Sequence, residues 1–599
     1  MKAGARASAG ITPDHAEKMP LAKLLLASLV TAALSPVAAR SQAPHPQGEL
    51  LETNSEAGHY GGKLVIALRA EPKTLNPVIA VDGPSRDVIR RMMADLIFIN
   101  RQSHLTEPGL AKSWTVSPDG RRYTLQLRRG LCFSDGLPFD ADDVLFTFQV
   151  HLDDKVHSPQ RDLLVVGGKP LAVQKIDSHT VRFELAEPYA AAERLFDSIA
   201  VLPRHLLQKA HQEGKLAAAW DLTTPPRQIA GLGPFRLKEY VPGERLVLER
   251  NPHYWKVDRA GNRLPYLDEI FFLFVGSEDV QAIRFLAGET DVISRLSAKN
   301  FSALAKEQRA RGYRLDDLGP GLEYNFLFFN LNDLGPKGPA QIARKQAWFR
   351  QVSFRQAISA AIDREGIVRL VYRGRAAPLW AHVTPANRLW VNPAVPHPGR
   401  SLARARELLA AGGFAWKSDG TLIDGSGEAV EFSVVTSAGN ADRVQMATII
   451  QDDLKQLGMQ VHLVSLEFRA LVDRLMNTHE YEAAVLGLVS GDVDPTAEMN
   501  VWLRSGTTHL WNLGQRDPAA AWEIEIDRLM RQQLGEINHA ERKRLYDGVQ
   551  RLVAENLPLV CLVSPNILVG AKKGLGNFRP AIMDHYTLWN SEELFWTSR

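Results

Sequence analysis

The sequence predicts an α/β protein with more than one lobe. At 599 residues the chain is longer than a single hydrophobic core usually grows, so about three domains are expected. Residues 431–488 follow a β-α-β-α-β pattern, which is typical of an open sheet with parallel strands. Residues 96–226 carry short alternating strands instead, which indicates a separate strand-rich region.

The β-α-β-α-β pattern places two loops where ligands usually bind. Strands are expected at residues 432–435, 461–463 and 483–488, and helices at residues 441–457 and 468–472. In open α/β sheets, ligands bind beyond the carboxyl ends of the strands. The loops 436–440 and 490–495 lie there, so Asn440 and Asp492 are predicted ligand contacts. Asp492 has Gly and Pro nearby and no bases, which favours a fixed anionic contact for a cationic group.

Other elements follow from local signals. A strand is expected at 63–68, a hairpin turns at Pro242-Gly243, and one long helix is predicted over 353–372. A further helix begins at a Ser401 cap. The last apolar strand, residues 557–563, would return the chain to the region that begins at residue 61.

Composition and motifs exclude several classes of function. The 71 basic and 68 acidic residues give a net charge of only +3, and no basic run stands out. A nucleic-acid partner is therefore not expected. The sequence lacks a phosphate-binding Gly-Lys-Ser/Thr loop, a Gly-x-Ser-x-Gly elbow and zinc-ligand spacing. We predict no catalytic residues, no metal site and no cofactor.

The amino terminus predicts export. Lys18 and Lys23 precede an apolar run at 24–34, which is shorter than the roughly 20 residues that a spanning helix needs. A signal peptide is predicted over residues 1–43, with Met19 as an alternative start, and a flexible linker over 44–60. No transmembrane helix is expected in the mature chain.

The chain has two cysteines, Cys132 and Cys561. Each lies in a strand-like run, so both are predicted to be small apolar residues, buried or half-buried, with a disulfide between them as the less favoured alternative.

Several dispersed motifs together resemble a known family. They are YTLQLRRGLCFSDG at 123–136, PFDADDV at 138–144, GLGPF at 231–235, RNPHYW at 250–255, GETDV at 288–292 and FRQAISAAIDR at 354–364. In this order they resemble the family 5 extracellular solute-binding proteins, the oligopeptide- and dipeptide-binding components of ABC importers. The resemblance covers nearly all of residues 61–599.

The resemblance implies a two-lobed periplasmic-binding-protein clamshell of the class C type, with an extra strand-rich domain inserted in the first lobe. Lobe I would comprise residues 61–95, 226–320 and 560–599, the inserted subdomain 96–225, and lobe II 321–559. The lobes would rotate about crossovers near 319–325 and 557–565 and enclose the ligand. The implied partners are a peptide or other small solute and the permease and ATPase subunits of an ABC importer, outside the cytoplasmic membrane.

By the same resemblance, Asp492 would hold the α-ammonium group of a bound peptide. The sequence departs from the family pattern just upstream, where Leu488 and Val489 replace the usual aromatic residue. Ligands other than peptides remain open, namely oligosaccharides, opine-like compounds and chelated nickel. An exported hydrolase using Asp492 and Asp494 as paired carboxylates is a second class of function, and capping of the following turn is a purely structural role for Asp492.

Five further residues are candidate ligand contacts. Asn76 lies at the predicted cleft edge of the first lobe, although Asn-Pro also forms turns. Tyr324 and Asn325 lie at the crossover, where they would line the cleft or pack the hinge. Trp380 and Trp511 lie in loop-like stretches, where an aromatic ring stacks on a ligand or packs in the core.

Overall fold

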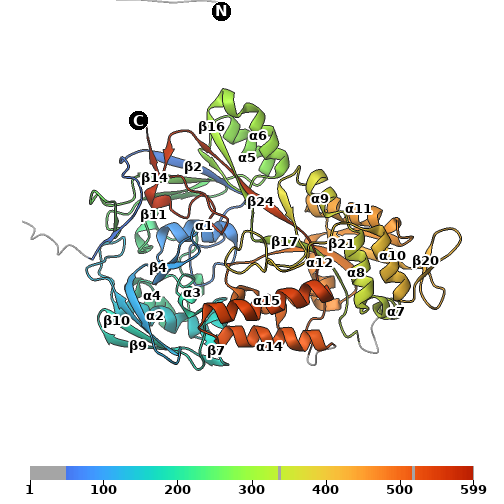
Figure 1. The fold of residues 1–599 in the computed structure, drawn as a ribbon. Helices are drawn as coiled ribbons and strands as arrows, with labels where there is room; N and C mark the ends of the chain where they lie inside the picture. The colour runs from blue at the N-terminus through green and yellow to red at the C-terminus, as the bar shows by residue number, and fades with distance from the viewer. Residues whose placement is uncertain (1–48, 335–338, 516–519, 598–599) are drawn as a thin grey trace, which may run out of the picture. The chain divides into compact units, whose positions relative to one another are not determined.

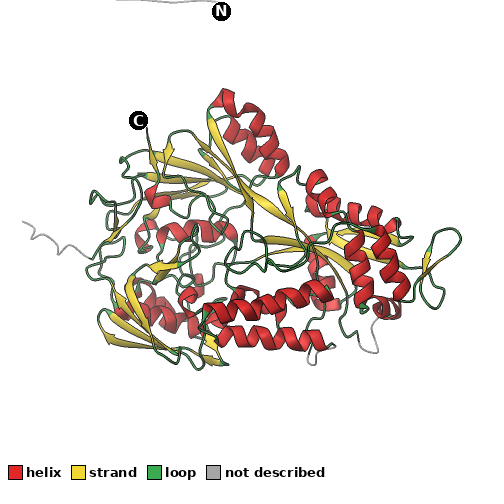
Figure 2. Ribbon diagram, in the orientation of Figure 1, coloured by secondary structure: helices red, strands yellow, loops and turns green. Residues whose placement is uncertain are grey.

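The computed structural model describes residues 49–334, 339–515 and 520–597 (Figures 1 and 2). The predicted signal peptide, residues 1–43 with the alternative start Met19, lies outside the described residues. Across the described ranges, no helix is both long and apolar enough to cross a bilayer.

One twelve-stranded sheet runs through the described chain. Its main path is β11 (Phe235–Val241), β12 (Arg245–Arg250), β14 (Glu269–Phe274), β2 (Lys63–Leu68), β15 (Val292–Ile293), β24 (Val560–Lys572), β17 (Glu323–Phe329), β23 (Ala483–Val489), β21 (Glu431–Ser437) and β22 (Gln460–Leu466). β16 (Tyr313–Pro320) and β18 (Ala376–Pro378) pair with β24 beside this path. We call the part built on β11, β12, β14, β2 and β15 the first lobe, and the part built on β17, β23, β21 and β22 the second lobe.

Two chain segments connect the lobes. β24 pairs with β15 of the first lobe near Ala571 and with β17 of the second lobe near Val563. β16 ends at Pro320 and β17 begins at Glu323. These segments coincide with the crossovers expected near 319–325 and 557–565; the residue boundaries of the domains stay a prediction.

In the first lobe, β2 is parallel to both β14 and β15. Its helices are α1 (Gly83–Met92), α4 (Arg204–Gln212), α5 (Glu278–Leu286) and α6 (Ala298–Arg311). α5 and α6 pack as a pair, seen in green in Figure 1. The hairpin predicted at Pro242-Gly243 joins β11 to β12, with Gly243 at φ +70°.

The inserted region has its own core. A four-stranded antiparallel sheet contains β5 (Ala111–Val116), β6 (Arg122–Leu127), β10 (Thr180–Glu184) and β9 (Ala172–Asp177). Helix α2 (Ala141–Leu152) begins at an Asp140 cap, whose side chain accepts a hydrogen bond from the Asp142 amide at 2.8 Å. The rings of Phe148 and Phe183 pack with centroids 4.8 Å apart, so the helix and the sheet share one apolar layer.

The second lobe contains the predicted parallel unit. β21 is parallel to β22 and to β23, joined by α11 (Ala441–Lys455) and α12 (Phe468–Asp473). Its other main helices are α7 (Ala340–Phe349), α8 (Val352–Ala361), α9 (Arg364–Leu370), α10 (Leu402–Ala411), α14 (Ala521–Gly535) and α15 (His539–Asn556). α14 and α15 lie side by side, seen in red at the bottom of Figure 1.

The helix predicted over 353–372 is two helices, α8 and α9. The break falls at Asp363, whose carboxylate accepts a hydrogen bond from the Gly366 amide at 2.8 Å and so caps α9. A side-chain cap of this kind competes with the continuing helical backbone bonds. Apolar periodicity alone missed it, because the pattern continues across the break.

Residues 49–60, predicted as part of a flexible linker, instead pack on the folded chain. β1 (Leu51–Glu52) pairs in parallel with β13 (Lys256–Val257). Leu51 packs against the core of the inserted region, and the Glu49 carboxylate pairs with Lys112 at 2.8 Å. Leu50 and Leu51 supply the apolar area for this packing. The prediction of a flexible linker missed them, because the segment is polar as a whole.

Both cysteines are free thiols. Cys561 is buried and Cys132 is half-buried. Burial raises the pKa of the Cys561 thiol to about 12, so it behaves as a small apolar residue.

Candidate ligand-binding cavity

A cavity of about 490 Å³ is bordered by both lobes and the inserted region. The first lobe contributes one face of α1, and the carboxyl-terminal segment contributes residues 583–585. The inserted region contributes residues that include Tyr189, Arg194 and Asp197, and the second lobe contributes Gly491, Asp492, Thr496 and Ala497. This volume is in the range of small-molecule sites, about 300–1,000 Å³.

Helix α1 turns basic and apolar side chains to the cavity. Arg86, Ile89, Arg90 and Met93 all line it and recur at helical spacing. The helix is fixed at its start by Asp82, whose carboxylate accepts from the Ser85 amide at 2.9 Å.

The loop after β23 carries the predicted contact, Asp492. The Ser490 hydroxyl donates to the Asp492 backbone oxygen at 2.6 Å. The Asp494 carboxylate accepts from the Thr496 amide at 3.0 Å and from its hydroxyl at 2.9 Å. These local bonds fix the loop, as Asp and Ser side chains commonly do in turns.

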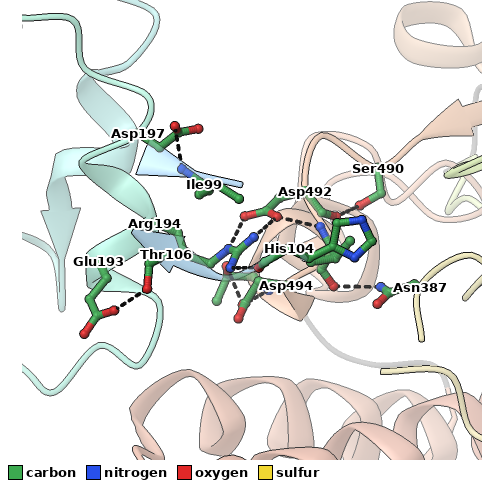
Figure 3. A network of polar contacts seen from close by, with 12 residues as sticks. Ile99, His104, Thr106, Glu193, Arg194, Asp197, Asn387, Ser490, Asp492 and Asp494 are labelled. Carbon is green, nitrogen blue, oxygen red and sulfur yellow. Dashed lines mark hydrogen bonds and ion pairs between the residues drawn. The ribbon is translucent and has the colours of Figure 1, made fainter. Parts of the chain in front are cut away.

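Asp492 pairs with Arg194 of the inserted region (Figure 3). The guanidinium Nε and Nη2 donate to the two different carboxylate oxygens, which makes the pair bidentate. The third nitrogen, Nη1, donates to the His104 backbone oxygen at 3.0 Å. Only 14% of the Arg194 side chain and 19% of the Asp492 side chain are exposed. One ion pair therefore connects the inserted region to the second lobe at the edge of the cavity.

Asp494, two residues later, pairs within its own lobe. Its two oxygens accept from Nη1 and Nη2 of Arg542, on α15, each at 2.9 Å. Arg542 also donates to the backbone and side-chain oxygens of Gln533, on α14, at 3.0 and 2.9 Å. Burial opposes ionisation of Asp494, but the hydrogen bonds and charge of Arg542 keep its pKa below the usual value.

A second charged network lies beside α1. Asp197 accepts from Arg101 at 2.8 Å, from Arg90 at 3.2 Å and from the Ile99 amide at 3.0 Å. Arg90 also pairs with Asp95. Burial raises the pKa of Asp95 to about 7, against the opposing charge of Arg90. These charged groups are paired with one another within the protein, so they line the cavity without an unpaired charge.

The site offers charges and hydrogen-bonding groups. Within the part of the chain that the structure describes, no cluster of three or more His, Cys, Asp or Glu side chains could hold a metal ion. Burial and the charge of Asp494 raise the pKa of Tyr189, which lines the cavity, to about 12. Its hydroxyl therefore remains a hydrogen-bond donor at neutral pH.

Comparison with known proteins identifies the family. The model of the bacterial extracellular solute-binding proteins, family 5 Middle, matches residues 106–509, more than half of the chain. The chain belongs to this family. It has the two-lobed α/β fold of periplasmic binding proteins, with the strand-rich region inserted in the first lobe.

Relatives of this solute-binding protein cover most of its length. A probable ABC transporter-binding protein of Deinococcus radiodurans is 28% identical, over 83% of this chain and 85% of its own. The oligopeptide-binding protein AppA of Bacillus subtilis is 23% identical, over 87% and 89%. The crystal structure of the ABC transporter substrate-binding protein CtaP of Listeria monocytogenes matches with a TM-score of 0.73 and 23% identity, over 90% of this chain and all (100%) of that chain.

Of the seven candidate ligand contacts, Asp492 lines the 490 Å³ cavity and the other six do not. In the first lobe, Asn76 is buried, and its amide donates to the backbone oxygens of Leu216 and Ala219 at 2.7 and 3.1 Å. Its side chain thus fixes the loop before Pro77, which does line the cavity.

The crossover candidates are buried in the second lobe. The Tyr324 hydroxyl donates to Glu498 at 2.7 Å, and burial next to this carboxylate raises the pKa of Tyr324 well above its ordinary value. Asn325 accepts from Nε of Arg443 at 3.0 Å. Both residues contact protein groups near the hinge, and a ligand contact for them stays a prediction.

The remaining candidates also contact protein groups. Asn440 caps α11 by accepting from the Arg443 amide at 3.0 Å. Trp511 is buried and donates to Glu523 at 3.2 Å. Trp380 stacks on His397, with ring centroids 4.4 Å apart. For these three residues, too, a role in ligand binding stays a prediction.

Sequence reasoning missed the arginines on the first-lobe side of the cavity, although it placed Asn76, next to the lining residue Pro77, at the cleft edge. Arg194 lies in a short helix, α3 (Ala192–Leu195), with no motif around it. The arginines of α1 resemble any solvated helix face in the sequence. A weak signal was available, because Arg86 and Arg90 alternate with Ile89 and Met93 on one face.

Proposed function

We propose that this solute-binding protein captures peptides with a free amino terminus between its lobes and delivers them to an ABC import permease. The observation that carries the proposal is the Asp492 carboxylate at the wall of the cavity, which accepts a hydrogen bond from the Val493 amide of its own loop at 2.6 Å. A carboxylate in that position suits the α-ammonium group of a peptide. The name of the Bacillus subtilis relative, an oligopeptide-binding protein, supports the same ligand class.

Closure of the lobes would couple capture to delivery. The cavity has walls from both lobes, so a ligand that contacts both favours the closed arrangement over the open one. A permease can then distinguish the closed form, and its partner ATPase supplies the energy. The predicted signal peptide supports a location outside the cytoplasmic membrane.

Hydrolysis by the two carboxylates of the loop is less well supported. Paired carboxylates act as acid and base when one holds a proton and the other is free to accept one. Both oxygens of Asp494 are bound by Arg542, and the pKa of this carboxyl is lowered. Asp494 thus has a structural role in the second lobe.

The proposal is tested with Asp492→Asn and a matched pair of ligands, Ala-Ala-Ala and its N-acetylated form. We expect the variant to lose about tenfold to a hundredfold in affinity for the free tripeptide, which is the worth of a charged hydrogen bond. Its affinity for the acetylated form, weak from the outset, should change little. Isothermal titration calorimetry measures both.

Asp584→Asn is the control, because it removes another carboxylate from the same cavity wall. We expect it to change both affinities by a similar factor. Equal losses for both ligands in Asp492→Asn would remove Asp492 from the amine contact. Failure of the unchanged protein to bind any peptide of a broad panel would exclude the peptide class.

A further inference from the structure

Arg194 already occupies the carboxylate that a ligand ammonium would need. Nε and Nη2 of Arg194 contact the two oxygens of Asp492, and the Val493 amide donates to one of these oxygens at 2.6 Å. The cavity borders both side chains. A cation entering from the cavity therefore has to displace the guanidinium before it can bind Asp492.

Displacement would leave Arg194 without a carboxylate. Three other carboxylates of this network already have partners (Figure 3). Glu193 accepts from Thr106 and Trp114, each at 2.8 Å; Asp197 is held by Arg90 and Arg101; Asp494 is held by Arg542. Because Arg194 is largely buried, leaving its charge uncompensated is unfavourable. A ligand that brings only a cation thus forms a contact with Asp492 but breaks the contact between Asp492 and Arg194.

A ligand avoids this loss if it supplies an acceptor oxygen as well as the ammonium. The amino-terminal residue of a peptide carries both groups on neighbouring carbons, the ammonium on Cα and the carbonyl oxygen on the next carbon. Asp492 and Arg194 present the complementary groups side by side, a carboxylate and a planar donor fork. The ion pair can therefore open into two contacts with the same ligand residue.

We propose that Arg194 is a specificity-determining residue, which donates to the first carbonyl oxygen of the ligand while Asp492 accepts from its α-ammonium group. The site then selects α-amino acyl ends, as in peptides, over amines that lack a carbonyl group. This inference rests on the proposed function and narrows its substrate class. Selection arises because the wrong ligand leaves a buried charge unpaired.

The test combines Arg194→Gln with three probes in a thermodynamic cycle. The probes are Ala-Ala-Ala, the same tripeptide with an E-alkene in place of its first peptide bond, and cadaverine as an amine without a carbonyl group. For the unchanged protein we expect the alkene probe to bind about tenfold more weakly than the tripeptide, or weaker still. Cadaverine should not displace bound tripeptide at concentrations at which the tripeptide itself saturates the protein.

In Arg194→Gln, we expect tripeptide affinity to fall about tenfold and the penalty for the alkene to shrink to about threefold or less. Arg194→Lys keeps the charge but loses the planar pair of donors. Its tripeptide affinity should therefore lie between those of the unchanged protein and Arg194→Gln. Arg400→Gln is the matched control: Arg400 pairs with Asp453 of the second lobe at 2.6 Å and does not line the cavity. It should leave all three affinities unchanged, and thermal unfolding verifies that each variant is folded.

Three outcomes overturn the inference. Equal or tighter tripeptide binding by Arg194→Gln would make Arg194 a competitor of the ligand and not its partner. An alkene penalty of the same size in both proteins would place the carbonyl contact elsewhere. Cadaverine binding as tight as peptide binding would remove the selection. In all three the peptide function stands, whereas absence of peptide binding by the unchanged protein overturns both proposals.

Discussion

Asp492 and Asp494 are separated by one residue, yet their ion pairs lie in different places. Each binds one arginine through both oxygens. The Asp494–Arg542 pair lies inside the second lobe, with 6% of each side chain exposed. The Asp492–Arg194 pair joins the second lobe to the inserted region beside the cavity, with 19% and 14% exposed. The comparison teaches that the location of the partner, and not the local sequence, distinguishes an ion pair enclosed in one lobe from the cavity-lining pair that we propose a ligand opens.

The largest effect is expected from breaking the inner pair. Asp494→Ala leaves Arg542 buried and uncompensated, which costs about 3–5 kcal/mol of unfolding free energy for a pair of this kind. Urea unfolding followed by circular dichroism measures it. Replacing both partners, as in Asp494→Leu with Arg542→Met, should recover much of the loss, because the remaining charge is removed as well. A loss below 1 kcal/mol in the single variant would contradict the structural role.

Acid should destabilise the interior that surrounds this inner pair. Burial lowers the pKa of His382 to about 3 and of His509 to about 4, so both stay neutral in the folded second lobe. The unfolded chain takes up these protons below about pH 6.5, so stability is present above that pH and is lost as it falls toward 4. We expect about 1–3 kcal/mol per histidine.

The measurement is the unfolding free energy between pH 7.5 and 4.5. His382→Phe should flatten the curve, while His462→Gln should not, because 59% of the His462 side chain is exposed. An unchanged slope in His382→Phe would show that this histidine is not kept neutral by folding.

The outer pair should contribute less to stability than the inner one. Asp492→Asn leaves the largely buried Arg194 without a charged partner, but at the edge of a cavity that water can enter, so we expect a loss of about 1–2 kcal/mol. The same urea unfolding experiment compares it directly with Asp494→Asn. If the two variants lose equal stability, the distinction between a structural pair and a ligand-facing pair fails.

The smallest effect is expected from salt. The outer pair connects the second lobe to the inserted region, so screening its charges should shift the lobes slightly toward the open arrangement. Small-angle scattering between 0.05 and 1 M sodium chloride should show a modest rise in the radius of gyration. Arg194→Gln should show this larger radius at low salt already. An identical, salt-independent radius for both proteins would mean that the pair does not favour closure.

Local patterns predicted most of the elements that carry the site. The unit that begins at residue 431 appears as β21, α11, β22, α12 and β23, within a few residues of the predicted bounds. Gly458, in the turn after α11, has φ +83°, which a glycine adopts without strain. Such signals are local, because each depends on side chains within a few residues of one another.

Partner choice could not be predicted in the same way. Arg194 and Asp492 are 298 positions apart, and neither has a neighbour in the sequence that indicates the other. Asp363 shows the same limit at short range, because apolar spacing continues across the helix break that its carboxylate makes. Tyr324 was predicted at the cleft or the hinge, and its hydrogen bond to Glu498 depends on a loop 174 positions away.

The sequence by itself determined the family, the α/β class and the loop of the second lobe that borders the cavity, since periodicity, caps and dispersed motifs depend on residues close together in the chain. Only the tertiary structure decided which arginine each of the two carboxylates meets, and that Asp494 is enclosed within the second lobe. The physical reason is that burial and distance set the strength of a charge pair, and both arise when distant segments pack together.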